Sequence, residues 1–160
     1  MLATSDGEGL DVSPKGDPAG FIKVLDTKTL VIPDRPGNNR IDGLLNLLKH
    51  PQMGLLFLIP TVDETLRVNG SAEIISSPEI CSKYALNGKA PKTVTKLTIN
   101  EVFMHCGKAP LRGGIWKPET WPIKRPVPNL YEIVKGQVQE YEVPNLTQDE
   151  IQLNYDKTLY

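Results

Sequence analysis

The stretch Thr29-Leu-Val-Ile-Pro-Asp-Arg-Pro-Gly-Asn-Asn-Arg40 passes from strand-forming to turn-forming residues and leads into a helical pattern. Its first five residues are apolar or β-branched and predict a strand, whereas the next six have the composition of a turn. After it, apolar residues recur at the spacing of one helix face, at Ile41, Leu44, Leu45 and Leu48. We therefore predict a helix from about Asn39 to His50, with Asn38 or Asn39 as its N-cap and Pro51 at its end.

Two arginines, Arg35 and Arg40, flank the start of this predicted helix. A helix N-terminus carries a partial positive charge, so a cation there costs about 0.3–1 kcal/mol unless an anion lies beside it. Free backbone N–H groups together with guanidinium groups are the donors that bind a phosphate. Alternatively, the two arginines face solvent or pair with Asp34 and Asp42. Neither the P-loop nor the dinucleotide-binding spacing is present, so a mononucleotide or a simple phosphoester is the expected anion.

Segments on both sides of this stretch alternate between apolar and polar residues, which is typical of an antiparallel sheet. One hairpin is predicted to join 2–5 to 10–15 through Asp6-Gly-Glu-Gly9, and a second to join 21–25 to 29–33. A strand buried on both faces is predicted over 53–59, and longer strands over 64–77 and 92–106, with a bulge at Asn100-Glu101. A short helix capped by Ser77 is expected to run to about Asn87. The prediction is a mainly β fold, a small antiparallel β-barrel with helices.

The last third of the chain is rich in proline. Six of the 14 prolines lie between Pro110 and Pro144, and this density excludes an all-helical bundle because an interior proline breaks a helix. The chain is expected to be irregular from Pro110 onward, with helices only over 129–141 and 147–155. Residues 117–160 are predicted to form an arm that belongs to the same domain as the barrel of residues 1–116.

Composition excludes several classes of protein. The formal net charge of −1 argues against a protein that binds nucleic acid through bulk charge. No apolar run approaches the roughly 20 residues that span a bilayer, and no signal-peptide pattern is present. The two cysteines form no C-x-x-C pair and the two histidines lack metal-ligand spacing, so neither a disulfide framework nor a metal site is expected. A reducing cytoplasm is the expected location.

Two further segments carry polar groups. Ser13-Pro-Lys-Gly16 ends a predicted strand, where proline removes a backbone donor and glycine permits close approach; alone, it indicates a solvated strand end. His105 and Cys106 are neighbours on a strand, so they face opposite sides and do not form a dyad. Lys108 is either a cation facing a ligand or a surface charge. No constellation for nucleophilic catalysis is present.

Five segments that follow one another in order carry a family resemblance: Asp11-Val-Ser-Pro-Lys-Gly-Asp-Pro18, Ile32-Pro-Asp-Arg-Pro-Gly-Asn-Asn-Arg40, Gly54-Leu-Leu-Phe-Leu-Ile-Pro60, Glu64-Thr-Leu-Arg-Val-Asn-Gly70 and Glu101-Val-Phe-Met-His-Cys-Gly-Lys-Ala109. From about residue 2 to residue 116 the chain resembles the pyridoxamine 5′-phosphate oxidase-like, FMN-binding split-barrel proteins. Within that family it is most similar to the predicted flavin-nucleotide-binding branch. The resemblance implies a six-stranded antiparallel split barrel and a homodimer with two FMN molecules at the subunit interface.

The resemblance also implies a cofactor site. In the family, the strand with the first basic motif lines the flavin ring, which here implies Ser13, Pro14, Lys15 and Gly16. The end of the next hairpin and the helix start hold the phosphate, which here implies Pro33, Asp34, Arg35, Asn38, Asn39 and Arg40. Two further contacts are implied, from Thr65 and, across the dimer, from Lys108 of the partner subunit.

The function implied is that of an FMN-dependent oxidoreductase with an unknown small-molecule substrate or electron donor. Two alternatives stay open. One is a non-catalytic FMN-binding or carrier module, and the other is a protein for a cofactor of similar shape, such as a deazaflavin or haem. True pyridoxamine phosphate oxidases hold their substrate with an arginine and a histidine near the C-terminus. No Arg-x-His exists in this chain, so the resemblance does not extend to that reaction.

Overall fold

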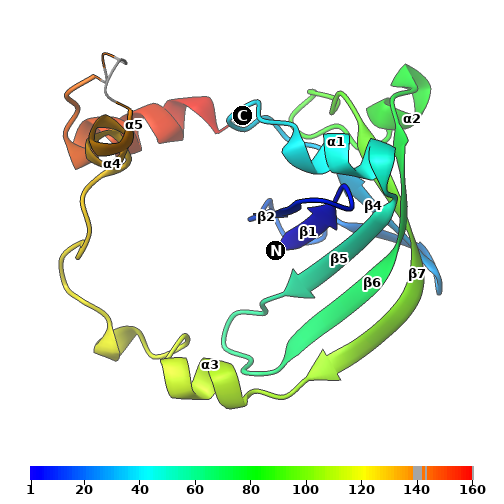
Figure 1. Ribbon diagram of the computed structural model, residues 1–160, viewed down its shortest axis with the longest axis horizontal. Helices are drawn as coiled ribbons and strands as arrows, with labels where there is room; N and C mark the ends of the chain where they lie inside the picture. The colour runs from blue at the N-terminus through cyan, green and yellow to red at the C-terminus, as the bar shows by residue number, and fades with distance from the viewer. Residues whose placement is uncertain (139–141, 143, 160) are drawn as a thin grey trace. The chain divides into compact units, whose positions relative to one another are not determined.

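One antiparallel sheet forms the first part of the chain, as the alternation of apolar residues predicts. The computed structural model describes residues 1–138, 142 and 144–159. It contains two compact units, Met1–Trp116 and Lys117–Tyr160. The sheet of the first unit has the strand order β2-β1-β5-β6-β7-β4-β3 (Figure 1). Its strands are β1 (Leu2–Ser5), β2 (Leu10–Ser13), β3 (Lys23–Asp26), β4 (Thr29–Pro33), β5 (Gln52–Phe57), β6 (Thr65–Ile75) and β7 (Val94–His105).

The predicted mainly β, antiparallel fold is confirmed, but the sheet has seven strands rather than six. Both predicted hairpins, β1–β2 and β3–β4, contribute both of their strands to the same sheet. The edge strands β2 and β3 are not paired with each other, so the sheet curves without closing. The helices of this unit are α1 (Asp42–Lys49), α2 (Pro78–Ser82) and α3 (Lys108–Gly113).

β4 is buried on both of its faces. Leu30 and Ile32 belong to the larger core cluster, which α1 covers with Leu47. Val31 points the other way, into a smaller cluster with Cys81 of α2 and Val94 of β7. Each fully buried side chain of this kind stabilises the fold by roughly 1.5–3 kcal/mol, so β4 is firmly fixed. The segment that follows β4 therefore starts from a rigid point.

β7 contains the predicted bulge. Asn69 of β6 lies opposite Glu101, whereas the next residue, Gly70, lies opposite Ile99, so Asn100 is the extra residue. Gly70 is required at this position because a Cβ atom there would overlap the Thr98 carbonyl oxygen and lie 3.0 Å from Leu97 Cδ1. The bulge thus depends on close approach of two backbones, which glycine permits.

Some element boundaries differ from prediction. α1 begins at Asp42 rather than about Asn39, because the Asn38 side chain accepts a hydrogen bond from Arg40 N instead of capping the helix (3.0 Å). α2 ends at Ser82 rather than near Asn87, which adopts a left-handed conformation (φ 50°) in a turn. β5 is not buried on both faces, since only alternate residues of it are fully buried.

α3 forms where irregular chain was predicted. Pro110 is its third residue, so it lies in the first turn, where a missing N–H group breaks no intrahelical hydrogen bond. Gly114, in the left-handed conformation (φ 61°), ends the helix. The indole N–H of Trp116 donates to the Val62 carbonyl oxygen (2.8 Å), which ties the chain after α3 to the segment before β6.

The second unit contains a 3-10 turn (Pro118–Thr120), α4 (Leu130–Gln137) and α5 (Gln148–Thr158). Both helices start with a capping box, formed by Asn129 with Glu132 and by Thr147 with Glu150. These helices were predicted at 129–141 and 147–155, and residues 139–141 lie outside the described part. That this unit belongs to the same domain as the barrel stays a prediction. None of the helices that the structure describes is both long and apolar enough to span a membrane.

Replacing Gly70 by alanine should destabilise the barrel by about 1–3 kcal/mol or more, because the Cβ atom meets the backbone of β7. Gly113→Ala is the matched control, since a Cβ atom there lies 3.8 Å from Ile115 Cγ1, an ordinary contact. Urea denaturation of both variants measures the free energy of unfolding. Equal stability of the two variants would contradict the described bulge geometry.

Candidate functional site

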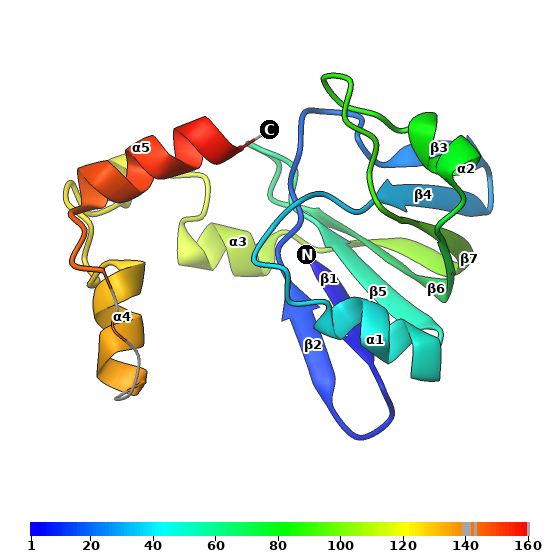
Figure 2. The ribbon, with the colours of Figure 1, turned by 90° about the horizontal axis from the view of Figure 1, so that it is seen from above.

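An ion pair joins the two segments that the resemblance assigns to the cofactor. Arg35 Nε donates to Asp17 Oδ2 over 2.6 Å. Asp17 directly follows the Ser13–Gly16 motif at the end of β2, and Arg35 lies in the connection between β4 and α1. Figure 2 shows this connection crossing the chain that leaves β2. The structure thus brings the predicted ring-binding and phosphate-binding segments together.

Arg35 is largely enclosed by protein. Its side chain is 14% exposed, and its Nη1 atom donates to the Tyr84 carbonyl oxygen (3.0 Å). The sequence left open a pairing of Arg35 with Asp34, but its partner is Asp17. The Asp17 side chain is fully buried, and its Oδ1 atom has no hydrogen-bond partner among the described residues. Sequence reasoning missed both Asp17 and Tyr84 because neither is near Arg35 in the chain.

Arg40 lies in a different environment. Its side chain is 75% exposed, and its Nη2 and Nε atoms lie 2.7 and 2.9 Å from Asp42 Oδ2. This is the pairing that the sequence left open for Arg40. Exposed ion pairs contribute only about 0.2–1 kcal/mol, so a phosphate can compete with Asp42 for this guanidinium group.

Backbone donors without protein partners precede and follow Arg40 in the chain. The first N–H groups of a helix have no intrahelical partner, and at the start of α1 no side chain caps them. In the described part of the chain, the N–H groups of Gly37, Asn38 and Asn39 donate to no protein acceptor. Asn39 is left-handed (φ 59°), a conformation that asparagine tolerates better than most residues. These groups, with the cation of Arg40, fit an anion such as a phosphate.

Pro33 and Asp34 form the fixed base of this connection. Pro33 is buried at the end of β4, opposite Val94 of β7. The N–H group of Asp34 donates to the Thr93 carbonyl oxygen (3.0 Å), which extends the attachment to β7 by one residue. Lys15, in the other segment, is exposed and has no ion-pair partner among the described residues. Its ammonium group is therefore available to a ligand.

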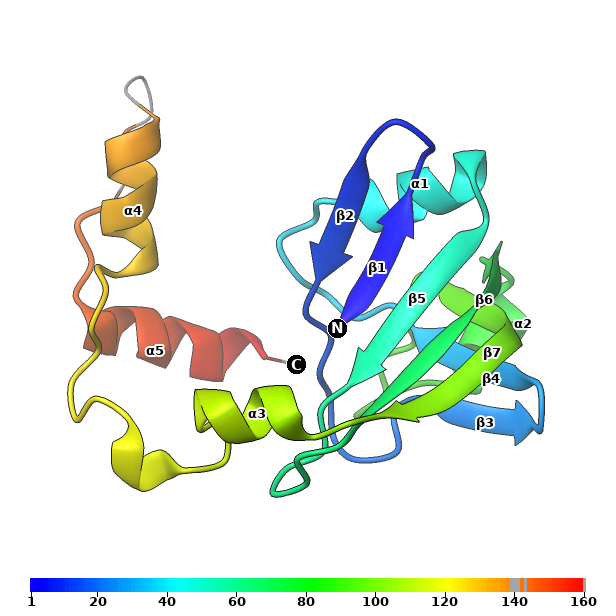
Figure 3. The same ribbon diagram turned by 60° about the horizontal axis from the view of Figure 1, so that its bottom comes forward.

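Thr65 and Lys108 lie at the same end of the sheet as Ser13–Gly16. Figure 3 shows β2, β1, β5, β6 and β7 side by side, and their register puts Ser13 level with Leu2, Leu55, Val68 and Val102. Beyond this row, the chain that leaves β2 leads to Gly16. Because β6 runs antiparallel to β2, the same end of the sheet contains the first residue of β6, Thr65. Thr65 is buried, and Lys108 begins α3. Three strand spacings separate β6 from β2, roughly 14 Å along the sheet, and no hydrogen bond among the described residues joins Thr65 to that motif.

The outer face of β6 and β7 carries a second group of polar and aromatic residues. The guanidinium carbon of Arg67 lies 4.9 Å from the centre of the Phe103 ring, and the rings of Phe103 and His105 are 6.4 Å apart. Strand alternation places Arg67 on the same face as Thr65. Cys106 is exposed and free, and it follows His105 without forming a dyad with it.

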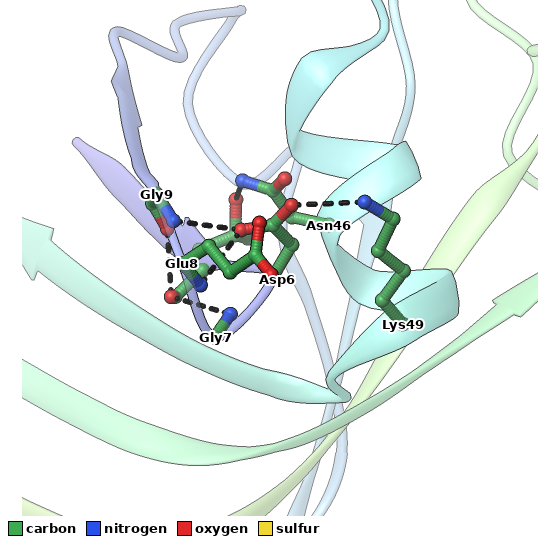
Figure 4. A network of polar contacts seen from close by, with 8 residues as sticks. Asp6, Gly7, Glu8, Gly9, Asn46 and Lys49 are labelled. Atoms are coloured by element: carbon green, nitrogen blue, oxygen red, sulfur yellow. Dashed lines mark hydrogen bonds and ion pairs between the residues drawn. The ribbon is translucent and has the colours of Figure 1, made fainter.

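A polar network holds α1 against the first hairpin (Figure 4). Asp6 Oδ1 accepts hydrogen bonds from the N–H groups of Gly9 (2.7 Å) and Glu8 (3.1 Å), and Lys49 of α1 lies 3.0 Å from Asp6 Oδ2. The Asn46 side chain donates to Thr4 Oγ1 (3.2 Å). The hydrogen bond from Gly9, followed by the contact with Lys49, holds the pKa of Asp6 far below its ordinary value.

The close contact between α1 and β2 also depends on Gly43. A Cβ atom on this first-turn residue would lie 3.3 Å from Asp11 Oδ2 and 3.5 Å from Thr4 Oγ1. Glycine therefore lets the start of α1 approach β2 closely. Together with the Asp6 network, this contact fixes the uncapped helix start beside the strand that leads into Ser13–Gly16.

We expect Asp6→Asn to lower stability at neutral pH, with the loss shrinking as the pH falls below about 4. Because folding lowers the pKa of Asp6, its contribution is present above the unfolded-state pKa and disappears as the carboxylate is protonated. Urea denaturation of both proteins across this pH range measures the difference. Glu8→Gln is the control, since this neighbouring side chain is exposed. A difference between wild type and Asp6→Asn that does not change with pH would contradict the assignment.

Comparison with solved structures supports this fold. HupZ from Group A Streptococcus is 24% identical to this chain, with a TM-score of 0.52 over 65% of this chain and 82% of that one. An FMN-binding protein from Syntrophomonas wolfei is 14% identical, with a TM-score of 0.51 over 66% and 75% of the two chains. No curated protein matches significantly. The family model described as pyridoxamine 5′-phosphate oxidase matches residues 1–106, and the chain thus belongs to the pyridoxamine 5′-phosphate oxidase-like family.

Proposed function

We propose that the protein is an FMN-binding flavoprotein whose phosphate site is the connection between β4 and α1. One observation carries this proposal: Arg40 is exposed beside unpaired N–H groups at an uncapped helix start. The ion pair between Asp17 and Arg35 supports the proposal, because it links the chain after Ser13–Gly16 to the same β4–α1 connection. The flavin site proposed in this subunit comprises Ser13, Pro14, Lys15, Gly16, Pro33, Asp34, Arg35, Asn38, Asn39, Arg40 and Thr65.

The residues of this chain would bind and orient the cofactor. Arg40, Asn38 and Asn39 supply donors to the phosphate, and Lys15 supplies a positive charge near the ring segment. Bound FMN would supply the redox chemistry, which agrees with the lack of a nucleophilic constellation in the sequence. We propose an oxidoreductase that acts in the cytoplasm on a small molecule.

We also propose that the active form is a homodimer in which Lys108 of the partner subunit completes the site. Apolar side chains on the outer face of the edge strand β2 support this proposal. Leu10 is 85% exposed and Val12 is 60% exposed, although both are large and apolar. A second copy of the chain would remove this apolar surface from water.

The purified protein should be yellow and should quench the fluorescence of added FMN in a saturable titration. We expect Arg40→Ala to weaken FMN binding by about 10- to 100-fold, since hydrogen bonds to charged groups contribute about 1.5–3 kcal/mol. Lys28→Ala is the control, because this exposed residue lies in the β3–β4 turn, at the opposite end of β4 from the proposed site. Equal affinities of the two variants would contradict the phosphate site, and the absence of saturable binding would contradict the function.

Introducing a charged side chain on β2 tests whether this strand forms the dimer interface. Val12→Lys should convert the dimer to a monomer in size-exclusion chromatography with light scattering, because it places a charge in the proposed apolar interface. FMN affinity should fall with it. Val24→Lys on the opposite edge strand, where Val24 is 71% exposed, should leave the dimer intact. A wild-type protein that is monomeric at micromolar concentration would overturn this part of the proposal.

Turnover distinguishes an enzyme from a carrier. The absorbance spectrum of the FMN-loaded protein should bleach when NADPH or NADH is added and recover in air over repeated cycles. Identification of the released ligand by mass spectrometry separates FMN from a deazaflavin or haem. Stable FMN binding without any redox cycling would favour the non-catalytic module instead.

A further inference from the structure

A buried ion pair lies at the base of the proposed cofactor site and joins three segments. Asp17 belongs to the chain after β2, Arg35 to the connection between β4 and α1, and Tyr84 to the chain after α2. Arg35 Nε lies 2.6 Å from Asp17 Oδ2, and Arg35 Nη1 lies 3.0 Å from the Tyr84 carbonyl oxygen. Two of the three guanidinium nitrogens are therefore bound by the protein itself.

We propose that Arg35 is a positioning residue for the flavin and not a ligand of its phosphate. In this role, the link from Asp17 through Arg35 to Tyr84 holds the Ser13–Gly16 segment at the place where it contacts the flavin ring. This inference rests on the proposed FMN site, and it divides the two arginines of the phosphate motif into different roles. Arg40 binds the anion, whereas Arg35 holds the segment beside it.

Burial separates the two arginines. The side chain of Arg35 is 14% exposed and that of Arg40 is 75% exposed. To reach a phosphate on the solvent side, Arg35 would have to leave a carboxylate that is fully buried. A buried charge without a partner is strongly unfavourable, so this movement is opposed by the desolvated Asp17. Asp17 Oδ1 already has no hydrogen-bond partner among the described residues, so losing Arg35 would leave both oxygens unpaired.

The segment from Pro14 to Gly20 has few other attachments. Within the described residues, its only other hydrogen bond runs from Phe21 N to the Pro18 carbonyl oxygen (3.2 Å), inside the same loop. Its ends are held by β2 and by Phe21, which packs against the core. The ion pair with Arg35 is thus the polar contact that fixes the middle of this segment. Without it, we expect the segment to move away from the β4–α1 connection.

The geometry requires arginine at this position. Its planar guanidinium group reaches a carboxylate with Nε and a carbonyl oxygen with Nη1, whereas lysine offers a single nitrogen. Arg35→Lys therefore keeps the positive charge but loses one of the two contacts. An arginine that binds the phosphate through its charge would tolerate replacement by lysine better than a positioning residue would.

Titrations with FMN and with riboflavin, which lacks the phosphate, test the inference in the full-length protein. We expect Arg35→Lys and Asp17→Asn each to weaken both flavins by at least about fivefold and by similar factors, because the ring segment is displaced. Arg40→Ala should weaken FMN alone and so abolish the preference for FMN over riboflavin. Far-UV circular dichroism verifies that each variant is folded, and Asp17→Asn serves where Arg35→Lys does not fold.

Two outcomes would overturn the inference. One is a loss on Arg35→Lys that is confined to FMN, and the other is tighter FMN binding by Asp17→Asn, which would mean that the released guanidinium binds the phosphate. Hydrogen exchange provides a readout without flavin: the Phe21 amide, which donates to the Pro18 carbonyl oxygen, should exchange faster in Asp17→Asn than in wild type or Arg40→Ala. If the wild type binds neither flavin, the proposed function is wrong, and unchanged exchange would separately show that the ion pair does not hold the segment.

Discussion

The burial of β4 on both faces is the constraint on which the candidate site depends. Leu30 and Ile32 pack into the larger core cluster, and Val31 packs into the smaller cluster beneath α2. A strand held from two sides cannot slide or rotate without disrupting both clusters. The connection to α1 consequently leaves the sheet at a fixed point, and Arg35, two residues beyond the strand, starts from a fixed backbone position.

The site could be predicted from sequence only in part. The motif from Pro33 to Arg40 indicates an anion site because it combines a helix start with two cations. Local sequence also contains the partner of Arg40, since Asp42 is two residues away. It does not contain the partner of Arg35, because Asp17 is 18 residues distant and reaches it only after β2 and β4 have taken their places. Which arginine is enclosed by protein and which faces solvent is thus decided by the tertiary structure.

For the fold as well, features set by nearby residues could be predicted from sequence. Alternation along β6 and the change of parity in β7 indicate the strands and the bulge at Asn100, because both reflect one buried face. Capping boxes at Asn129 and Thr147 are equally local signals of helix starts, although proline-rich surroundings obscure them. The late start of α1 was not predictable in this way. There the Asn38 side chain accepts a hydrogen bond from Arg40 N instead of capping the helix, and the sequence allows both.

The bulge in β7 also determines which residues of this strand face outward. It divides the strand into an inner half, where Leu97 and Ile99 face the core, and an outer half, where Phe103 and His105 face outward beside Arg67. A one-residue insertion in an ordinary strand turns every later side chain to the opposite face. In β7 the bulge at Asn100 contains the extra residue, so the alternation of inward and outward side chains changes parity after it. The inward residues before the bulge and the outward residues after it are therefore all at odd-numbered positions, although they serve opposite faces of the same strand.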